Sequence, residues 1–114
     1  MADPFNIYEA IDAVRRRPSL WLRSHSIVEL QGFVTGCLYT AGMHDLEKCE
    51  QPDFRDLDCF VAERLLCERP SQGWCNILLR ECGGDESKAL DLFFDLVAEF
   101  RNSGYESGIL RERY

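Results

Sequence analysis

The chain has 114 residues, a net charge of −7, an apolar fraction of 46% and a charged fraction of 29%. This length and composition are those of a globular protein whose core needs no metal or disulfide staple. The N-terminus, MADPFNIYEAIDAV, lacks the basic start and apolar run of a signal peptide, and no stretch reaches the roughly 20 apolar residues of a membrane span. We therefore expect a cytoplasmic protein with one domain over residues 1–114, its core at about 6–103 and a fraying tail at 104–114.

The acidic charge is concentrated in the middle and later parts of the chain. Residues 1–41 carry four acids and four bases, whereas residues 42–100 carry fourteen acids and six bases. A field of this sign repels nucleic acid and anionic membranes and attracts basic partners. We therefore predict a basic protein partner, with no nucleic-acid partner and no membrane partner, and leave the oligomeric state open.

The first predicted helix spans about Ile7–Arg16. Asn6 and Glu9 have the spacing of a capping box, with asparagine in place of serine or threonine, and apolar residues then recur at helical spacing. Pro18 disfavours helical backbone at the residue before it, so the helix is expected to end near Arg16.

A basic segment, RRRPSLWLRSHS at residues 15–26, joins this helix to the next. It contains four arginines, a tryptophan and a histidine, which suit either a nucleic-acid surface or a corner between helices. We favour the corner, because residues 42–100 carry the charge that opposes nucleic-acid binding. We expect an extended segment that Leu20 and Trp21 anchor to the core, with its arginines paired to the chain's own acids.

The second predicted helix runs from Ile27 to about Ala41, with Ser26 and Glu29 as its capping box. Its core-facing stripe consists of Ile27, Leu30, Phe33, Val34, Cys37, Leu38 and Ala41. On another face, Gly32 and Gly36 lie one turn apart, and each costs up to about 1 kcal/mol in a helix. We expect a close contact with a helix or backbone segment to compensate at that face.

Three further helices are expected at about 53–65, 74–81 and 86–102. Turn residues separate them at Pro70–Gly73 and Gly83–Gly84, and Asp85 is the N-cap of the last helix. No alternating run is long enough to indicate a strand. The predicted fold class is therefore all-α, a single-domain bundle of about five helices with the fifth helix central.

The six cysteines and two histidines show no metal-site spacing, because there is no C-x-x-C pair and no H-x₃-H array. We expect reduced, mostly buried thiols, with no metal and no cofactor. The motifs G-x-S-x-G, GxGxxG, HExxH and the Walker loop are also missing. A protein without enzymatic activity is the prediction; the alternative is a small enzyme that uses Cys75, in the first turn of the fourth helix, or carboxylates of the fifth helix.

Two segments, RRRPSLWLRSHSIVELQGFVTG and RPSQGWCNILLRECGGDESKALDLFFDLVAEF, together resemble a family of small bacterial proteins, over roughly Ile7 to Phe100. The family pattern combines an R-P-x-M-Y-[LI]-G corner, a serine-capped helix ending in G-Y, a G-W-x-x-[IL]-L segment and a D-x-x-K-A-[LF] helix start. The later motifs fit this chain, as GWCNIL and DESKAL. The corner departs from the pattern, because Leu20, Trp21 and Arg23 replace its methionine, tyrosine and glycine.

Some members of that family are regarded as immunity-type proteins of contact-dependent growth inhibition or polymorphic toxin systems. The resemblance therefore implies an antitoxin, a toxin inhibitor that acts through protein–protein interaction. Its expected mechanism agrees with the acidic charge: carboxylates would stand in for phosphates and occlude the basic cleft of a cognate toxin, such as a nuclease.

The predicted partner-binding residues are Asp45, Glu47, Glu50, Asp53, Asp56 and Asp58. The secondary candidates are Asp91, Asp95 and Glu99, which form a narrow acidic stripe on the fifth helix. Two alternatives remain open beside the toxin inhibitor. One is an acidic adaptor or regulatory protein that binds another basic partner, and the other is the small enzyme described above.

Overall fold

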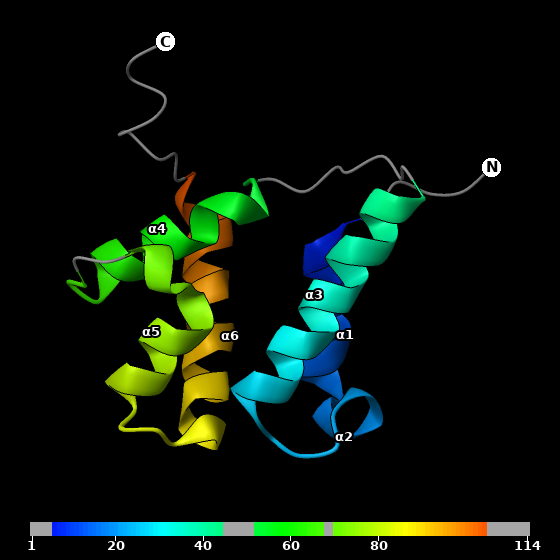
Figure 1. The fold of residues 1–114 in the computed structure, drawn as a ribbon, viewed down its shortest axis with the longest axis horizontal. Helices are drawn as coiled ribbons and strands as arrows, with labels where there is room; N and C mark the ends of the chain where they lie inside the picture. Colours follow the sequence, from blue (N-terminus) through cyan, green and yellow to red (C-terminus); the bar gives the residue numbers. More distant parts are fainter. Residues whose placement is uncertain (1–5, 45–51, 68–69, 105–114) are drawn as a thin grey trace, which may run out of the picture.

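The computed structural model describes residues 6–44, 52–67 and 70–104, and within these ranges the chain is helical without strands (Figure 1). The elements in order are α1 (Ile7–Arg16), α2 (Pro18–Trp21), α3 (Ile27–Met43), η1 (Phe54–Asp56), α4 (Leu57–Arg64), η2 (Pro70–Gln72), α5 (Trp74–Glu81) and α6 (Glu86–Ser103), where η denotes a 3₁₀ turn. The all-α prediction is confirmed. Five of the described helices have eight or more residues, as the predicted bundle of about five requires.

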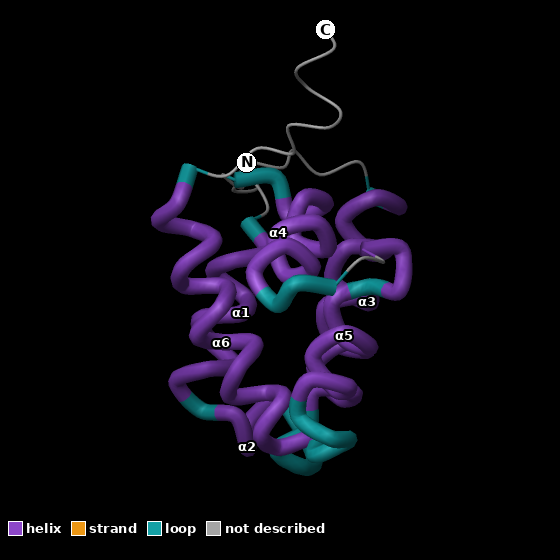
Figure 2. The backbone as a smooth tube through the Cα atoms, turned by 90° about the vertical axis from the view of Figure 1, so that its left-hand side faces the viewer, coloured by secondary structure: helices purple, strands orange, loops and turns teal. Residues whose placement is uncertain are grey.

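Helix α6 lies at the centre of the bundle, as predicted. It packs against α3, α4 and α5, and the Arg101 guanidinium reaches the Asp12 carboxylate of α1 at 2.9 Å. Figure 1 shows α6 between α5 and the α1–α3 pair, with α4 across one end, and Figure 2, turned by 90°, shows α4 at the same end of the bundle. The buried side chains of α6 are Ala89, Leu90, Phe93, Phe94, Leu96, Val97 and Phe100.

Aromatic rings tie the elements to α6. Trp74 of α5 lies 4.7 Å from Phe93, and Phe60 of α4 lies 5.1 Å from Phe100, both measured between ring centroids. Tilted pairs at this separation contribute about 0.5–1.5 kcal/mol each beyond the burial of their area. Trp74 is therefore a partly buried side chain that packs against the core.

Local side-chain caps explain where the longer helices begin. The predicted caps act as N-caps: Asn6 accepts from the backbone N–H of Tyr8, Ser26 from that of Val28, and Asp85 from those of Ser87 and Lys88. At the other end of α6, Gly104 takes a left-handed conformation with φ +66°, which glycine adopts without a steric penalty. Capping chemistry thus positions α1, α3 and α6.

The corner after α1 differs from the prediction of an extended segment. Pro18 begins a single helical turn, α2, which closes when the Leu22 N–H donates to the Pro18 carbonyl at 2.8 Å. This turn makes Leu22 the buried anchor, at 6% exposure, and leaves Leu20 at 66% and Trp21 at 47%. The predicted anchoring by Leu20 and Trp21 is therefore wrong, although the Trp21 ring packs 5.8 Å from that of Phe33.

The predicted contact over Gly32 and Gly36 is also wrong. A Cβ placed on either glycine would meet no atom of the described chain within 4 Å, so both face open space. Each glycine in a helix interior costs roughly 0.5–1 kcal/mol relative to alanine. Within the described residues, no contact compensates this cost.

Helix α5 receives its N-terminal cap from another helix. Gly73 precedes it and offers no side chain, and Asp58 of α4 instead accepts a hydrogen bond from the Trp74 N–H at 2.8 Å. Burial raises the pKa of Asp58, and the hydrogen bond from Trp74 opposes this rise. Asp58 thus joins the α4 and α5 helices through one carboxylate.

We predict that Asp58→Ala lowers the free energy of unfolding by about 1–2 kcal/mol at pH 7, which is the usual loss when a helix cap is removed. Asp58→Asn keeps an acceptor oxygen and should retain more of the stability. Because the folded-state pKa is raised, proton uptake by Asp58 favours folding below the unfolded pKa, and this contribution is lost as pH rises through the folded pKa. In urea denaturation, the free energy of unfolding of wild type should therefore rise relative to that of Asp58→Asn as pH falls. A difference between the two that does not change with pH would contradict this role of Asp58.

Candidate functional site

Three carboxylates form an exposed row on α6, which we call the acidic ladder: Asp91, Asp95 and Glu99. Each follows the previous one by four residues, about 6 Å along the helix axis, and therefore lies on the same side. Their side chains are exposed by 67%, 72% and 48%. The structure thus brings together the secondary candidates of the sequence analysis, on one outward side of the central helix.

Each carboxylate of the ladder contacts a basic side chain from a different part of the chain. The pairs are Asp91 with His25 Nε2 at 2.7 Å, Asp95 with Arg15 Nη2 at 3.6 Å, and Glu99 with Arg64 Nε at 3.3 Å. The contact with His25 is an ion pair only when the imidazole is protonated. Since exposed ion pairs contribute only about 0–1 kcal/mol, water and other cations compete for these carboxylates.

Two of these bases lie in the basic segment 15–26: Arg15 in the last turn of α1 and His25 just before α3. Pairing of the segment's arginines with the chain's own acids is observed for Arg15, whereas the side chains of Arg16, Arg17 and Arg23 are exposed. The Arg23 backbone N–H instead donates to Glu29 Oε1 at 2.7 Å. Beside the corner is a hollow of about 350 Å³, lined by Pro18, Ser19, Leu22, Arg23, Ser24 and His25.

The leading candidates of the sequence analysis do not form one exposed surface among the described residues. Asp45, Glu47 and Glu50 lie outside the residues that the structure describes. Asp53 caps η1 through the Arg55 N–H and pairs with the Arg55 guanidinium at 2.7 Å. Asp56 is only 8% exposed, and Asp58 caps α5. Burial of Asp56 and the capping role of partly buried Asp58 do not favour contact of these two carboxylates with a partner, and binding by the six residues stays a prediction.

Cys75 is poorly placed for nucleophilic catalysis. Its side chain is 2% exposed, and the thiol lies 4.0 Å from the backbone carbonyl of Ile27. Burial raises the pKa of the Cys75 thiol, and the charge of Glu86 raises it further, so the reactive thiolate is disfavoured. Within residues 6–44, 52–67 and 70–104, no three His, Cys, Asp or Glu side chains are grouped as a metal site would require.

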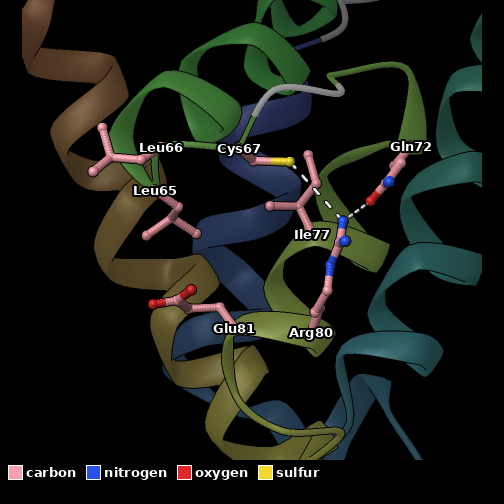
Figure 3. A pocket seen from close by; sticks show the side chains of 7 residues that line it. All are labelled: Leu65, Leu66, Cys67, Gln72, Ile77, Arg80 and Glu81. Carbon is pink, nitrogen blue, oxygen red and sulfur yellow. Dashed lines mark hydrogen bonds between the residues drawn. The ribbon is translucent and has the colours of Figure 1, made fainter.

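A hollow of about 380 Å³ opens between the C-terminal end of α4 and α5 (Figure 3). It is lined by Leu65, Leu66, Cys67, Gln72, Ile77, Arg80 and Glu81. The Arg80 guanidinium donates to the Gln72 side-chain oxygen and approaches the Cys67 sulfur at 3.9 Å, while Leu66 is 90% exposed with φ +56°. The hollow thus combines leucine and isoleucine side chains with the charged groups of Arg80 and Glu81.

Sequence reasoning missed this hollow. The apolar run places Leu65 on the core side of a continuing helix, and the structure partly buries it there. Leu66 then turns the chain in a left-handed conformation, which glycine or asparagine ordinarily adopts. No residue type in the local sequence marks that turn.

These features define a small all-α bundle whose central helix carries an ion-paired acidic row. None of the described helices combines the length and apolar character that spanning a membrane requires. Comparison of the chain with protein-family models, curated proteins and solved structures finds no match. The resemblance to immunity-type proteins therefore stays a prediction.

Glu29 fixes the corner that carries His25 to the ladder. One carboxylate oxygen accepts from the Arg23 N–H, and the other accepts from the Ser24 hydroxyl. The hydrogen bond from Ser24, followed by that from Arg23, lowers the pKa of Glu29. The carboxylate is thus bound more strongly by the corner when it is ionised.

We predict that Glu29→Gln lowers the melting temperature at pH 7. Since the folded-state pKa is lowered, the contribution of Glu29 is present above its unfolded pKa and is lost as pH falls through the folded value. The difference from wild type should shrink in thermal melts taken at progressively lower pH. Glu9→Gln, which removes the matching first-turn carboxylate of α1, is the control. An equal, pH-independent effect of the two substitutions would contradict this role.

Proposed function

We propose that this chain is an immunity-type protein that binds and neutralises a basic toxin domain, with the acidic ladder as its main contact. The single observation that carries the proposal is the row of three exposed carboxylates on α6, each held by an exchangeable pair. The surplus of acids over residues 42–100 adds a long-range attraction for a basic partner.

The ladder suits a cleft that binds a phosphate backbone. Its outer members, Asp91 and Glu99, are eight residues apart, so the row extends for about 12 Å along the helix. Arginines and lysines that line a nuclease cleft would meet a row of anionic groups in place of phosphates. The inhibitor would then exclude substrate by occupying the cleft, without any chemical turnover.

The ion pairs within the chain favour exchange of its own bases for the bases of a partner. Arg15, His25 and Arg64 hold the carboxylates in place from three elements before a partner arrives. Replacement of one exposed pair by another costs little, because each contributes only about 0–1 kcal/mol. A partner arginine that is buried on binding forms a stronger, charge-assisted contact than the exposed pair it displaces.

The experiment that tests the proposal begins with capture of the partner from the bacterium that encodes the chain. The captured domain is then titrated with wild type and variants at low and high salt. We predict that the double variant Asp91→Asn/Asp95→Asn associates about tenfold more slowly at low salt, with a smaller difference at high salt. The matched control is Glu9→Gln/Glu81→Gln, which removes two exposed charges outside the ladder and should change association far less.

Growth assays connect binding to function. Co-expression of wild type should protect cells from the captured domain, and the ladder double variant should protect less at the same expression level. A captured partner without toxicity would favour the adaptor alternative. Binding that ignores both salt and the ladder substitutions would contradict the proposal.

A further inference from the structure

Helix α3 presents an uncharged side to solvent. From Leu30 to Met43 its sequence, LQGFVTGCLYTAGM, contains no charged residue. The exposed residues opposite its core-facing side, which we call the α3 outer face, are Val28, Gly32, Thr35, Gly36, Tyr39 and Met43. Two large side chains of this face, Tyr39 and Met43, are 68% and 65% exposed.

The α3 outer face has a definite relief. Gly32 and Gly36 leave open space above the backbone, while Val28 on one side and Tyr39 on the other project from it. Small residues on a helix surface allow a second helix to approach closely, and larger ones on either side fill the gaps beside it. The face therefore has the form of a helix-packing surface that no described part of the chain covers.

We propose that the α3 outer face binds the same face of a second copy of this chain, as an antiparallel helix pair. The midpoint of such a pair lies between Thr35 and Gly36. Gly32 and Tyr39 are equally distant from this point and differ by only about 20° around the helix, so each tyrosine lies over a glycine of the other copy. Val28 and Met43 are also equally distant from this point but differ by about 60° around the helix, so their side chains lie near one another rather than directly opposite.

Charge selects a second copy over the partner of the acidic ladder. The α3 outer face offers no carboxylate to pair with the lysines or arginines of a basic protein, and burying those charges unpaired would be costly. Two copies of the α3 outer face bring together neither unpaired charges nor like charges. A self-complementary patch of this kind is what a two-fold dimer requires.

The available area indicates a weak dimer. The helix from Val28 to Met43 is about 22 Å long and about 10 Å wide, which is well below the roughly 800 Å² per partner of a standard stable interface. Trp21, which is 47% exposed and packs on Phe33, adds one apolar side chain at the flank of α3. We therefore expect a reversible dimer whose population depends on concentration.

Sedimentation equilibrium of the full chain under reducing conditions, over about 1 µM to about 1 mM, tests the proposal. The mass of wild type should rise from 13.2 kDa towards twice that value. Tyr39→Glu and Gly32→Lys should each weaken self-association at least tenfold, whereas Leu66→Glu, a substitution at a 90% exposed site outside the face, should leave it unchanged. A wild-type chain that stays monomeric throughout, or a dimer that survives both substitutions, overturns the proposal.

The Gly36→Ala variant distinguishes an effect on the stability of the chain from an effect on the dimer interface. The added Cβ meets open space and raises helix propensity, so the urea midpoint should rise while self-association weakens. Because misfolding would lower the midpoint, weaker association at a higher midpoint can only come from the interface. Unchanged association in this variant counts against close approach at the glycines.

A mixing experiment tests the antiparallel orientation. When Gly32→Lys and Tyr39→Glu chains are mixed, the antiparallel pair places the introduced lysine of one copy opposite the introduced glutamate of the other. Native mass spectrometry should then detect the mixed dimer at concentrations where neither variant dimerises alone. Failure to recover a dimer on mixing overturns this orientation. The inference concerns α3 alone, so it stands or falls separately from the proposed toxin binding.

Discussion

The amphipathic character of α6 is the constraint on which the rest of the structure depends. Its apolar residues occupy so much of the circumference that α3, α4 and α5 all pack against it. Only a narrow strip of the helix surface remains for polar side chains, and the acidic ladder, whose residues are four apart, occupies this strip. The position of the acidic ladder is therefore a consequence of how the core is built.

That strip in turn holds the periphery of the bundle. Through the ladder, α6 contacts α1, the corner before α3, and α4, which are elements far apart in sequence. Each contact is weak because it is exposed. The same weakness leaves the carboxylates open to exchange, so one row of side chains can serve both to orient neighbouring elements and to meet a basic partner.

The sequence predicts those parts of the fold that local chemistry decides. Caps and apolar periodicity define α1, α5 and α6 to within about two residues of their bounds, which is the usual uncertainty of helix ends. The corner was beyond such reasoning, because a single turn begun at Pro18 decides whether Leu20 or Leu22 faces the core. The roles of Asp56 and Asp58 likewise depend on how α4 meets α5, which no local pattern contains. Leu66 adopts a conformation that its residue type disfavours.

The segregation of charge allows two associations of opposite character in one small chain. The axis of α6 lies on the core side of α3, about 8–10 Å away, and a second copy on the α3 outer face would add a further 8–10 Å. This separation exceeds the Debye length of about 8 Å at physiological salt, so the ladder opposes self-association only weakly there. Added salt weakens attraction of the ladder to a basic protein, whereas it reduces the repulsion between two chains of charge −7. The two surfaces should therefore respond to ionic strength in opposite directions, because one depends on charge and the other on its absence.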